Sequence, residues 1–279
     1  MRGDGAGADV SRVALITGAS SGIGAATARL LHSHGYRVVL VARSADALQA
    51  LADELGDGAW ARPCDVSDHA SLPGLVQEAV EHFGTLDVLV NNAGVHHRGS
   101  MLRHTPEQLA EMITVNTAAP IALTRIAADF MPPGSVVVNV ASLAGKLPVP
   151  GAATYSGSKA GLRFWAMAAA EDLAARQIRI ASINPGPVDS GFLETDLDNV
   201  TPMTFSQPMS TVEQCAQAVL RAIETEVSEI DLPFASGKLA TLGYVAPPLR
   251  RLLRPVLEKR GARVKEQLRS RKRADTGHI

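Results

Sequence analysis

The strongest constraint on the fold is the alternation of short apolar runs with longer helical stretches along most of the chain. Apolar runs lie at 13–16, 37–41, 86–90, 135–140 and 178–183, and a further strand is expected near Glu229–Leu232. Stretches with helical character lie between them at 45–55, 68–83, 106–130 and 154–176. This alternation is typical of βαβ units, in which right-handed crossovers connect parallel strands. We therefore expect an α/β fold built on a parallel sheet.

Local signals punctuate these elements without indicating a second domain. Pro132-Pro133-Gly134 should end the long helix before the strand at 135. Ser210-Thr211-Val212-Glu213 reads as a capping box that opens a helix to about residue 225. A chain of 279 residues can bury about three quarters of its unfolded surface in one core. We predict a flexible N-terminus at 1–11 and a single domain at 12–236.

A glycine-rich turn, Thr17–Gly24 (TGASSGIG), follows the first apolar run and precedes a helical stretch. Glycines at such a turn permit positive φ and let backbone amides approach a pyrophosphate, and the helix N-terminus adds favourable partial charge. The spacing G-x-x-x-G-x-G differs from the usual dinucleotide pattern. The turn also fits G-x-S-x-G, the hydrolase nucleophile elbow, with Ser20 as nucleophile. Several strands and an oxyanion-hole loop should precede such an elbow, and we expect only one short strand.

A second motif contains the groups for carbonyl chemistry. Tyr155 and Lys159 are four residues apart and lie on one helix face, and Ser142 precedes them by thirteen positions. An ammonium group beside a phenol favours the phenolate, so we expect Lys159 to lower the pKa of Tyr155. Such a phenol can exchange a proton with a carbonyl or alcohol oxygen, and Ser142 can hydrogen-bond to the same oxygen. The hydrolase interpretation leaves these residues unexplained.

In this order and spacing, the motifs strongly resemble the short-chain dehydrogenase/reductase family, in its single-domain branch. The resemblance covers about residues 12–233 and rests on the glycine turn, Asp65-Val66, Asn91-Asn92-Ala93-Gly94, Asn116, Ser142, Tyr155, Lys159 and Pro185-Gly186. It implies a doubly wound, Rossmann-type parallel sheet and an enzyme that interconverts C=O and CH–OH with a nicotinamide cofactor. A non-catalytic cofactor-binding regulator is the alternative, although members that lose catalysis commonly lose the Tyr or the Lys.

The resemblance also implies roles for individual residues. Tyr155 would be the general acid/base and Ser142 would orient the substrate oxygen. Lys159 would hold the cofactor ribose, and Asn116 would anchor a water that connects Lys159 to solvent. The expected cofactor-binding residues are Gly18, Ser20, Ser21, Gly22, Ile23, Gly24, Arg43, Ser44, Asp65, Val66, Asn92, Ala93, Gly94, Tyr155, Lys159, Pro185, Gly186, Val188 and Ser190.

The end of the second predicted strand favours NADP(H) over NAD(H). Dinucleotide folds place an acid there for the ribose 2′-hydroxyl, or an Arg for a 2′-phosphate. The acid position is Ala42 and Arg43 follows at once, so a guanidinium can pair with the phosphate. Alternatively, Arg43 stacks on the adenine and the enzyme accepts either cofactor.

The segment at 190–210 is the expected substrate loop. Its apolar residues are Phe192, Leu193, Val200, Met203, Phe205 and Met209. They could form a mobile flap over an apolar pocket, or an ordinary helix and loop packed on the core. A bulky hydrophobic ketone or alcohol is therefore the expected substrate.

A basic segment ends the chain. Residues 250–273 contain eleven Lys and Arg against two Glu, so their net charge is +9, while the chain total is −1. Leu and Val recur there at helical spacing, and Pro255 should start or kink a helix. We predict a helical extension at 237–279 that packs over the substrate pocket. A basic amphipathic helix on an anionic membrane is the alternative.

The remaining features suggest few other partners. The extension lacks interleaved aromatic residues, so no nucleic-acid binding is expected. Neither an apolar leader nor a run of about 18–20 apolar residues is present, which predicts a cytoplasmic protein. Cys64 and Cys215 are expected to be buried thiols, and no metal site is expected. His96 and His97 directly follow Asn-Asn-Ala-Gly and could border the active-site mouth, but solvated loop residues are the default expectation. The resemblance implies a homodimer or homotetramer through 106–130 and 154–176.

Overall fold

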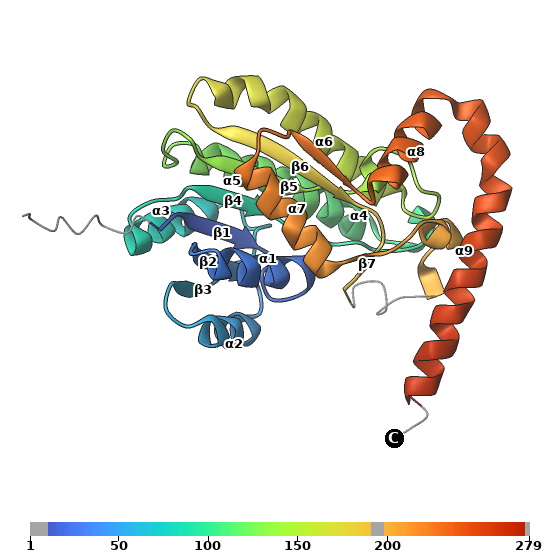
Figure 1. Cartoon of the computed structure of the whole chain (residues 1–279), viewed down its shortest axis with the longest axis horizontal. Coiled ribbons are helices and arrows are strands. Elements are labelled where there is room, and N and C mark those ends of the chain that lie inside the picture. The colour runs from blue at the N-terminus through green and yellow to red at the C-terminus, as the bar shows by residue number, and fades with distance from the viewer. Residues whose placement is uncertain (1–10, 191–197, 277–279) are drawn as a thin grey trace, which may run out of the picture.

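A seven-stranded parallel sheet forms the centre of the protein, as a computed structural model describes it for residues 11–190 and 198–276 (Figure 1). The strand order is β3-β2-β1-β4-β5-β6-β9, and every pairing in this sheet is parallel. The strands are β1 (Val13–Thr17), β2 (Arg37–Ala42), β3 (Ala59–Pro63), β4 (Val88–Asn91), β5 (Val136–Val140), β6 (Arg179–Pro185) and β9 (Glu229–Leu232). The predicted doubly wound, Rossmann-type sheet is confirmed.

Helices cover both faces of this sheet. They are α1 (Gly22–Ser33), α2 (Ala45–Leu55), α3 (Leu72–Phe83), α4 (Pro106–Ile113), α5 (Ala119–Ala127), α6 (Ala153–Ala174) and α7 (Val212–Glu224). Alternate residues of each strand face opposite sides, so β1 places Ala14 and Ile16 against α1, α2 and α7. Val13 and Leu15 belong to a second core with α3, α5 and α6. All five residues of β1 are buried, as a central parallel strand requires.

Two predicted elements differ in detail. The stretch predicted as one helix at 106–130 is divided into α4, a π-helical turn η2 (Thr114–Ala118) and α5. The capping box at the start of α7 lies one residue later than predicted. Thr211 is the N-cap, and it exchanges hydrogen bonds with Gln214 rather than Ser210 with Glu213. Ser210 and Thr211 form β8, which pairs with β7 (Val188–Asp189).

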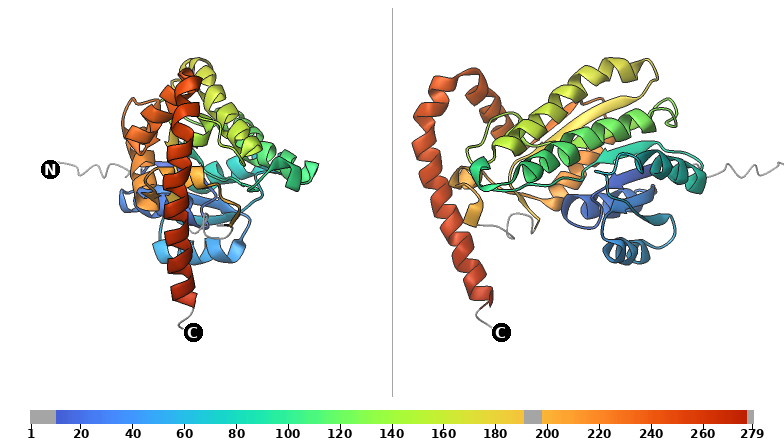
Figure 2. Two further views of the ribbon diagram at one scale, coloured as in Figure 1. Left: turned by 90° about the vertical axis from the view of Figure 1, so that its right-hand side faces the viewer. Right: turned by 180° about the vertical axis from the view of Figure 1, so that it is seen from behind.

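The C-terminal part of the chain forms a helical hairpin at one end of the molecule. Helix α8 (Phe234–Val245) leads into α9 (Pro247–Thr276), which crosses that end opposite α3 (Figures 1 and 2). Pro255 lies inside α9 and does not start it, in contrast to one of the two sequence expectations. Among the described residues, no helix has both the length and the apolar character needed to cross a bilayer.

Helix α9 is anchored to the 3-10 helix η5 (Pro202–Ser206) of the substrate loop. A Cβ at Gly261 would collide with the carbonyl oxygen of Pro202, so only glycine permits this crossing. Lys265 is buried, and its Nζ donates to the carbonyl oxygens of Asp198 (2.9 Å) and Val200 (2.6 Å). Buried Phe205 packs with apolar residues of α9 at the same contact. The described part of the loop is thus a packed segment, as one of the two sequence alternatives proposed.

Candidate active site

A cavity of about 990 Å³ lies at the carboxyl ends of the strands. Strand β1 pairs with β2 on one side and β4 on the other, so the chain connections leave the sheet in opposite directions there. Open α/β sheets bind ligands at this switch point. All expected cofactor-binding residues except Gly24 line the cavity. All expected catalytic residues except Asn116 line it as well.

The glycine turn forms the floor of the cavity between β1 and α1. Gly18 and Gly22 have positive φ, at 67° and 54°. A Cβ at Gly24 would collide with the carbonyl of Gly18, so Gly24 makes the turn tight rather than facing the cavity. Ser21 is the N-cap of α1 but makes no side-chain cap hydrogen bond. The first amides of α1 therefore point at a place that a pyrophosphate fits.

A hydrogen-bond cluster fixes this turn to the loop after β4. The Thr17 hydroxyl accepts from the backbone N of Asn92 and of Ala93, both at 3.0 Å, and donates to the carbonyl of Val90. The Asn92 amide donates to the carbonyl of Thr17 at 2.9 Å. Asn-Asn-Ala-Gly thus connects the ends of the neighbouring strands β1 and β4, which is a structural role for this motif.

The residues after β2 and β3 form the far wall. Arg43 and Ser44 are exposed where α2 begins, and Ser44 is its N-cap without a side-chain cap hydrogen bond. Asp65 accepts from the backbone and the hydroxyl of Ser67. Burial opposes its ionisation, but these hydrogen bonds and the charge of Arg43 lower the pKa of Asp65. Guanidinium, hydroxyl and helix N-terminus together suit a phosphate.

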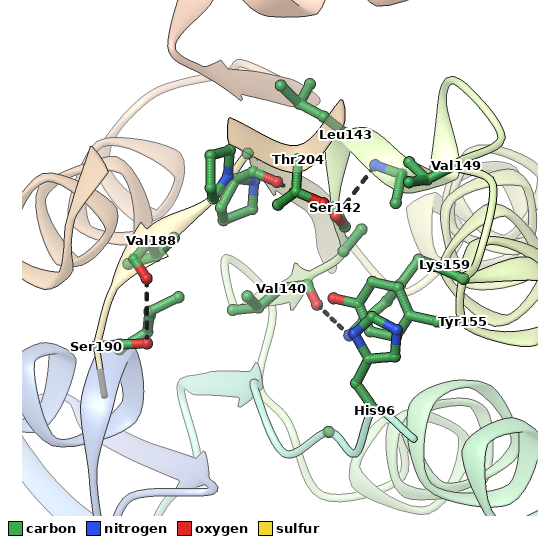
Figure 3. A pocket seen from close by; sticks show the side chains of 18 of the residues that line it. His96, Val140, Ser142, Leu143, Val149, Tyr155, Lys159, Val188, Ser190 and Thr204 are labelled. Atoms are coloured by element: carbon green, nitrogen blue, oxygen red, sulfur yellow. Dashed lines mark hydrogen bonds between the residues drawn. The ribbon is translucent and has the colours of Figure 1, made fainter. Parts of the chain in front are cut away.

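Tyr155 on α6 and Ser142 after β5 meet at the other end of the cavity (Figure 3). Burial of the phenol raises the pKa of Tyr155, while a hydrogen bond with Ser142 and the charge of Arg98 lower it. The predicted lowering of this pKa by Lys159 is therefore wrong for the protein alone, because desolvation outweighs the favourable charges. The Ser142 hydroxyl also lies 3.3 Å from the carbonyl of Pro185 and accepts from the backbone N of Ala144 at 3.1 Å.

Lys159 is buried one helical turn after Tyr155. Its Nζ donates to the carbonyl of Val140 at 2.7 Å, and burial lowers its pKa to about 8. Asn116 lies in the π-helical turn η2, and both the oxygen and the nitrogen of its side-chain amide form hydrogen bonds. It accepts from the backbone N of Val95 (2.8 Å) and donates to the carbonyl of Val95 and to Ser158. Asn116 thus holds the loop after β4 beside α6.

Sequence reasoning missed two residues at this site. The His96 ring stacks on the Tyr155 ring, with centroids 4.0 Å apart and planes 13° apart (Figure 3). Burial, with smaller contributions from nearby cations led by Arg98, lowers the pKa of His96 to about 3. Arg98 is buried and lines the cavity. The expectation that His96 is a solvated loop residue is wrong, since the loop after β4 folds inward over α6. The one sequence signal for this placement is the position of His96 just after Asn-Asn-Ala-Gly.

The segment after β6 closes the cavity near Ser142. The backbone N of Gly186 donates to the carbonyl of Leu232 at 2.6 Å. Val188 lies in β7, which pairs with β8. The Ser190 hydroxyl lies 3.5 Å from the carbonyl of Val188 (Figure 3). Phe192 and Leu193, expected in the substrate loop, lie outside the described residues.

The remainder of the cavity is largely apolar and extends to the C-terminal hairpin. The walls there include Leu143, Leu147, Val149, Met203, Leu239, Leu242 and Leu257, together with Arg260 of α9. No group of His, Cys, Asp or Glu in the described part of the chain could hold a metal ion. Of the two thiols, Cys215 is buried and Cys64 only half-buried. The site therefore combines a dinucleotide cradle, a phenol with two polar neighbours and an apolar chamber.

Comparisons with known proteins agree with this geometry. The short chain dehydrogenase family model matches residues 12–200. The chain is 34% identical over 224 residues to a ketoacyl reductase, HetN, from a Nostoc species, covering 78% of this chain and 77% of that protein. A 3-ketoacyl-(acyl-carrier-protein) reductase from Brucella melitensis, solved in complex with NADH, superposes with a TM-score of 0.70 at 29% identity, covering 79% and 96% of the two chains. A short-chain dehydrogenase from Streptomyces avermitilis gives 0.74 at 27%, covering 89% and 97%.

Proposed function

Because this chain belongs to the short chain dehydrogenase family, and is an oxidoreductase that acts on CH–OH groups with a nicotinamide cofactor, we propose that it uses NADP(H). Its substrates would be a bulky hydrophobic carbonyl compound and the corresponding alcohol, with Tyr155 as general acid/base. The observation that carries the proposal is one cavity that holds both the glycine turn and the group of Ser142, Tyr155 and Lys159.

The residues divide the work at the reacting oxygen. The bound nicotinamide supplies or accepts the hydride at the carbon. Tyr155 donates its proton to the oxygen that gains charge during reduction, and takes it back during oxidation. The Ser142 hydroxyl donates a hydrogen bond to the same oxygen and thereby stabilises its developing charge. Lys159 would hold the cofactor ribose, and Asn116 would hold the loop after β4 beside α6 through Val95 and Ser158.

Arg43 and Ser44 support NADP(H). Both are exposed at the N-terminus of α2, where a dinucleotide fold places the adenosine ribose. A 2′-phosphate there would accept from the guanidinium, the hydroxyl and the first helical amides. Asp65 is the nearby acid, and its charge is partly offset by Arg43.

The apolar chamber supports a hydrophobic substrate. Leucines of α8 and α9 and Met203 of η5 form walls beyond the Tyr155 hydroxyl. Burial of apolar substrate area contributes about 25 cal/mol per Å², so a long acyl or polycyclic group would bind better there than a small polar one. The ketoacyl reductase activity named for two of its relatives agrees with an acyl-type substrate.

A cofactor-consumption screen tests the proposal. Purified protein is incubated with NADPH or NADH and a panel of ketones and alcohols that ranges from small polar to long-chain and polycyclic compounds. We expect turnover of hydrophobic members with NADPH. Tyr155→Phe should lower kcat by at least about a thousandfold while the NADPH Kd changes little, because only the proton donor is lost. Tight NADPH binding without turnover of any member would favour the non-catalytic regulator instead.

A further inference from the structure

Exposed apolar side chains are concentrated in the C-terminal hairpin. Of thirteen large apolar side chains that are exposed in the described part of the chain, seven lie within residues 234–256. They are Phe234, Leu239, Leu242, Tyr244, Val245, Leu252 and Val256, and we call them the hairpin patch. Val245 and Leu252, beside the turn between α8 and α9, are 74% and 75% exposed. Large exposed apolar areas on soluble proteins mark interaction sites, so the concentration of these side chains in one hairpin points to a docking surface.

Helix α9 has two distinct faces. At 3.6 residues per turn, the residues that contact the substrate loop and cavity share one face: Leu257, Gly261, Val264, Lys265 and Leu268. An exposed stripe occupies roughly the opposite 60° of the helix: Leu252, Val256, Lys259 and Arg263. The inner face packs against η5. The outer stripe begins with Leu252 and Val256, which are 75% and 68% exposed among the described residues, so packing within the protein does not account for these two apolar side chains.

Positive charge next to the hairpin patch indicates what kind of surface could bind there. Arg254, Lys259, Arg260 and Arg263 are exposed on α9, and Lys238 lies over the ring of exposed Phe234 on α8. Within 234–263 the chain carries a single acid, Glu258, which pairs with Arg254. Apolar side chains followed by cations on one stripe match an anionic lipid surface, where the former enter the headgroup region and the latter contact the phosphates.

The patch is continuous with the mouth of the cavity. Leu239 and Leu242 are both about half exposed and also line the cavity. Leu257 and Arg260, which line it from α9, are adjacent to the stripe that Val256 and Lys259 form. A lipophilic molecule that leaves a bilayer at the hairpin would therefore enter the substrate chamber without crossing water.

We propose that the α8–α9 hairpin docks the enzyme on anionic membrane surfaces and receives lipid-soluble substrates from them. The substrate part of this inference rests on the proposed function, whereas the docking part is independent of it. The hairpin lies at the end of the molecule opposite α3 (Figures 1 and 2), so docking there leaves α3 on the side away from the membrane.

Vesicle co-sedimentation tests the docking. The full-length protein is mixed with phosphatidylcholine vesicles with and without phosphatidylglycerol, at low and high salt. We expect binding to the anionic vesicles that is at least tenfold stronger than to neutral ones and that weakens as salt screens the basic stripe. The double variant Leu252→Glu/Val256→Glu should lose at least tenfold in binding, and Lys259→Gln/Arg263→Gln should lose the difference between the two vesicle types.

Leu102→Glu is the matched control, because Leu102 is 88% exposed on the 3-10 helix η1 (Met101–Arg103), outside the patch. It should bind vesicles like the wild type, and all variants should keep the wild-type Tm. Equal binding of wild type and patch variants would overturn the proposal. A second result would also overturn it: the wild type does not bind vesicles, and Leu252→Glu/Val256→Glu converts an oligomer to a monomer. In that case a second copy of the chain covers the hairpin patch. Vesicle binding without any carbonyl reduction would leave the docking intact and refute the proposed function alone.

Discussion

At the residue scale, the site is dominated by desolvation rather than by simple charge pairing. Burial raises the pKa of Tyr155 and lowers the pKa of Lys159 to about 8, so both side chains move toward their neutral forms. The charge that lowers the Tyr155 pKa comes from Arg98, not from the lysine four residues along the helix. A motif gives the identity and spacing of these groups, but their burial depends on loops far away in sequence.

His96 provides a prediction on pH dependence. Its pKa is lowered to about 3 in the folded protein from an ordinary value near 6.5. The unfolded chain therefore binds an extra proton between these values, and stability must fall as pH falls from about 6.5 toward 3. The slope from this residue is at most about 1.4 kcal/mol per pH unit. We expect His96→Phe to keep the stacking on Tyr155 and to flatten the loss of Tm between neutral and mildly acidic pH.

The control is the solvent-accessible His34→Phe, which should follow the wild-type profile. Parallel Tm-against-pH curves for His96→Phe and wild type would contradict the prediction.

Arg43 provides a prediction on cofactor choice. Arg43→Ala should raise the KM for NADPH about 10- to 100-fold and change the KM for NADH little, because a charge-assisted phosphate contact is worth roughly 1.5–3 kcal/mol. Arg221→Ala, which removes an exposed arginine from α7, should change neither. The measurement is steady-state kinetics with both cofactors on one carbonyl substrate. Equal effects on the two cofactors would indicate that Arg43 stacks on the adenine instead.

At the element scale, the core strands and most helices follow directly from sequence patterns. Buried strands need continuous apolar runs, as β1 and β5 show. The half-buried edge strand β9 has no such run, although it too was predicted at the residues where it lies, Glu229–Leu232. The π-helical turn at 114–118 could not be predicted, because the side-chain pattern of a long helix continues through it. The anchoring of α9 on η5 was also beyond the sequence, since the need for glycine at 261 arises only when Pro202 lies against it.

Lys265 provides a prediction for this contact. Lys265→Met would leave the carbonyls of Asp198 and Val200 without the donor they have now, at a cost of about 1–3 kcal/mol. We expect faster amide hydrogen exchange in η5 and α9 and a higher substrate KM, with slow exchange retained in β1 and β4. Lys259→Met, the same change on the exposed face of α9, should leave exchange unchanged. Unaltered exchange in Lys265→Met would show that apolar packing alone holds the helix.

At the scale of the whole molecule, the outer face of α4 and α6 is the second apolar surface. Phe164 and Met167 on α6 are 54% and 60% exposed, and Ile113 at the end of α4 is 43% exposed. We predict that this face forms the homodimer or homotetramer contact. Phe164→Glu/Met167→Glu should shift the mass measured by light scattering to that of a monomer, while the hairpin variant Leu252→Glu/Val256→Glu should not. An unchanged mass in the α6 variant would place the contact elsewhere.

The residues expected to carry out catalysis and the residues that form the apolar part of the cavity come from different parts of the chain. In the proposed mechanism, proton transfer depends on residues fixed to the sheet and α6. Much of the apolar part of the cavity is instead built by α8, α9 and η5, all beyond the residues that the family model matches. Exchange of the terminal hairpin could therefore redirect which molecules are reduced without disturbing the machinery that reduces them. If the proposed function holds, substrate selectivity resides in an exchangeable C-terminal segment, and the catalytic residues stay the same when that segment changes.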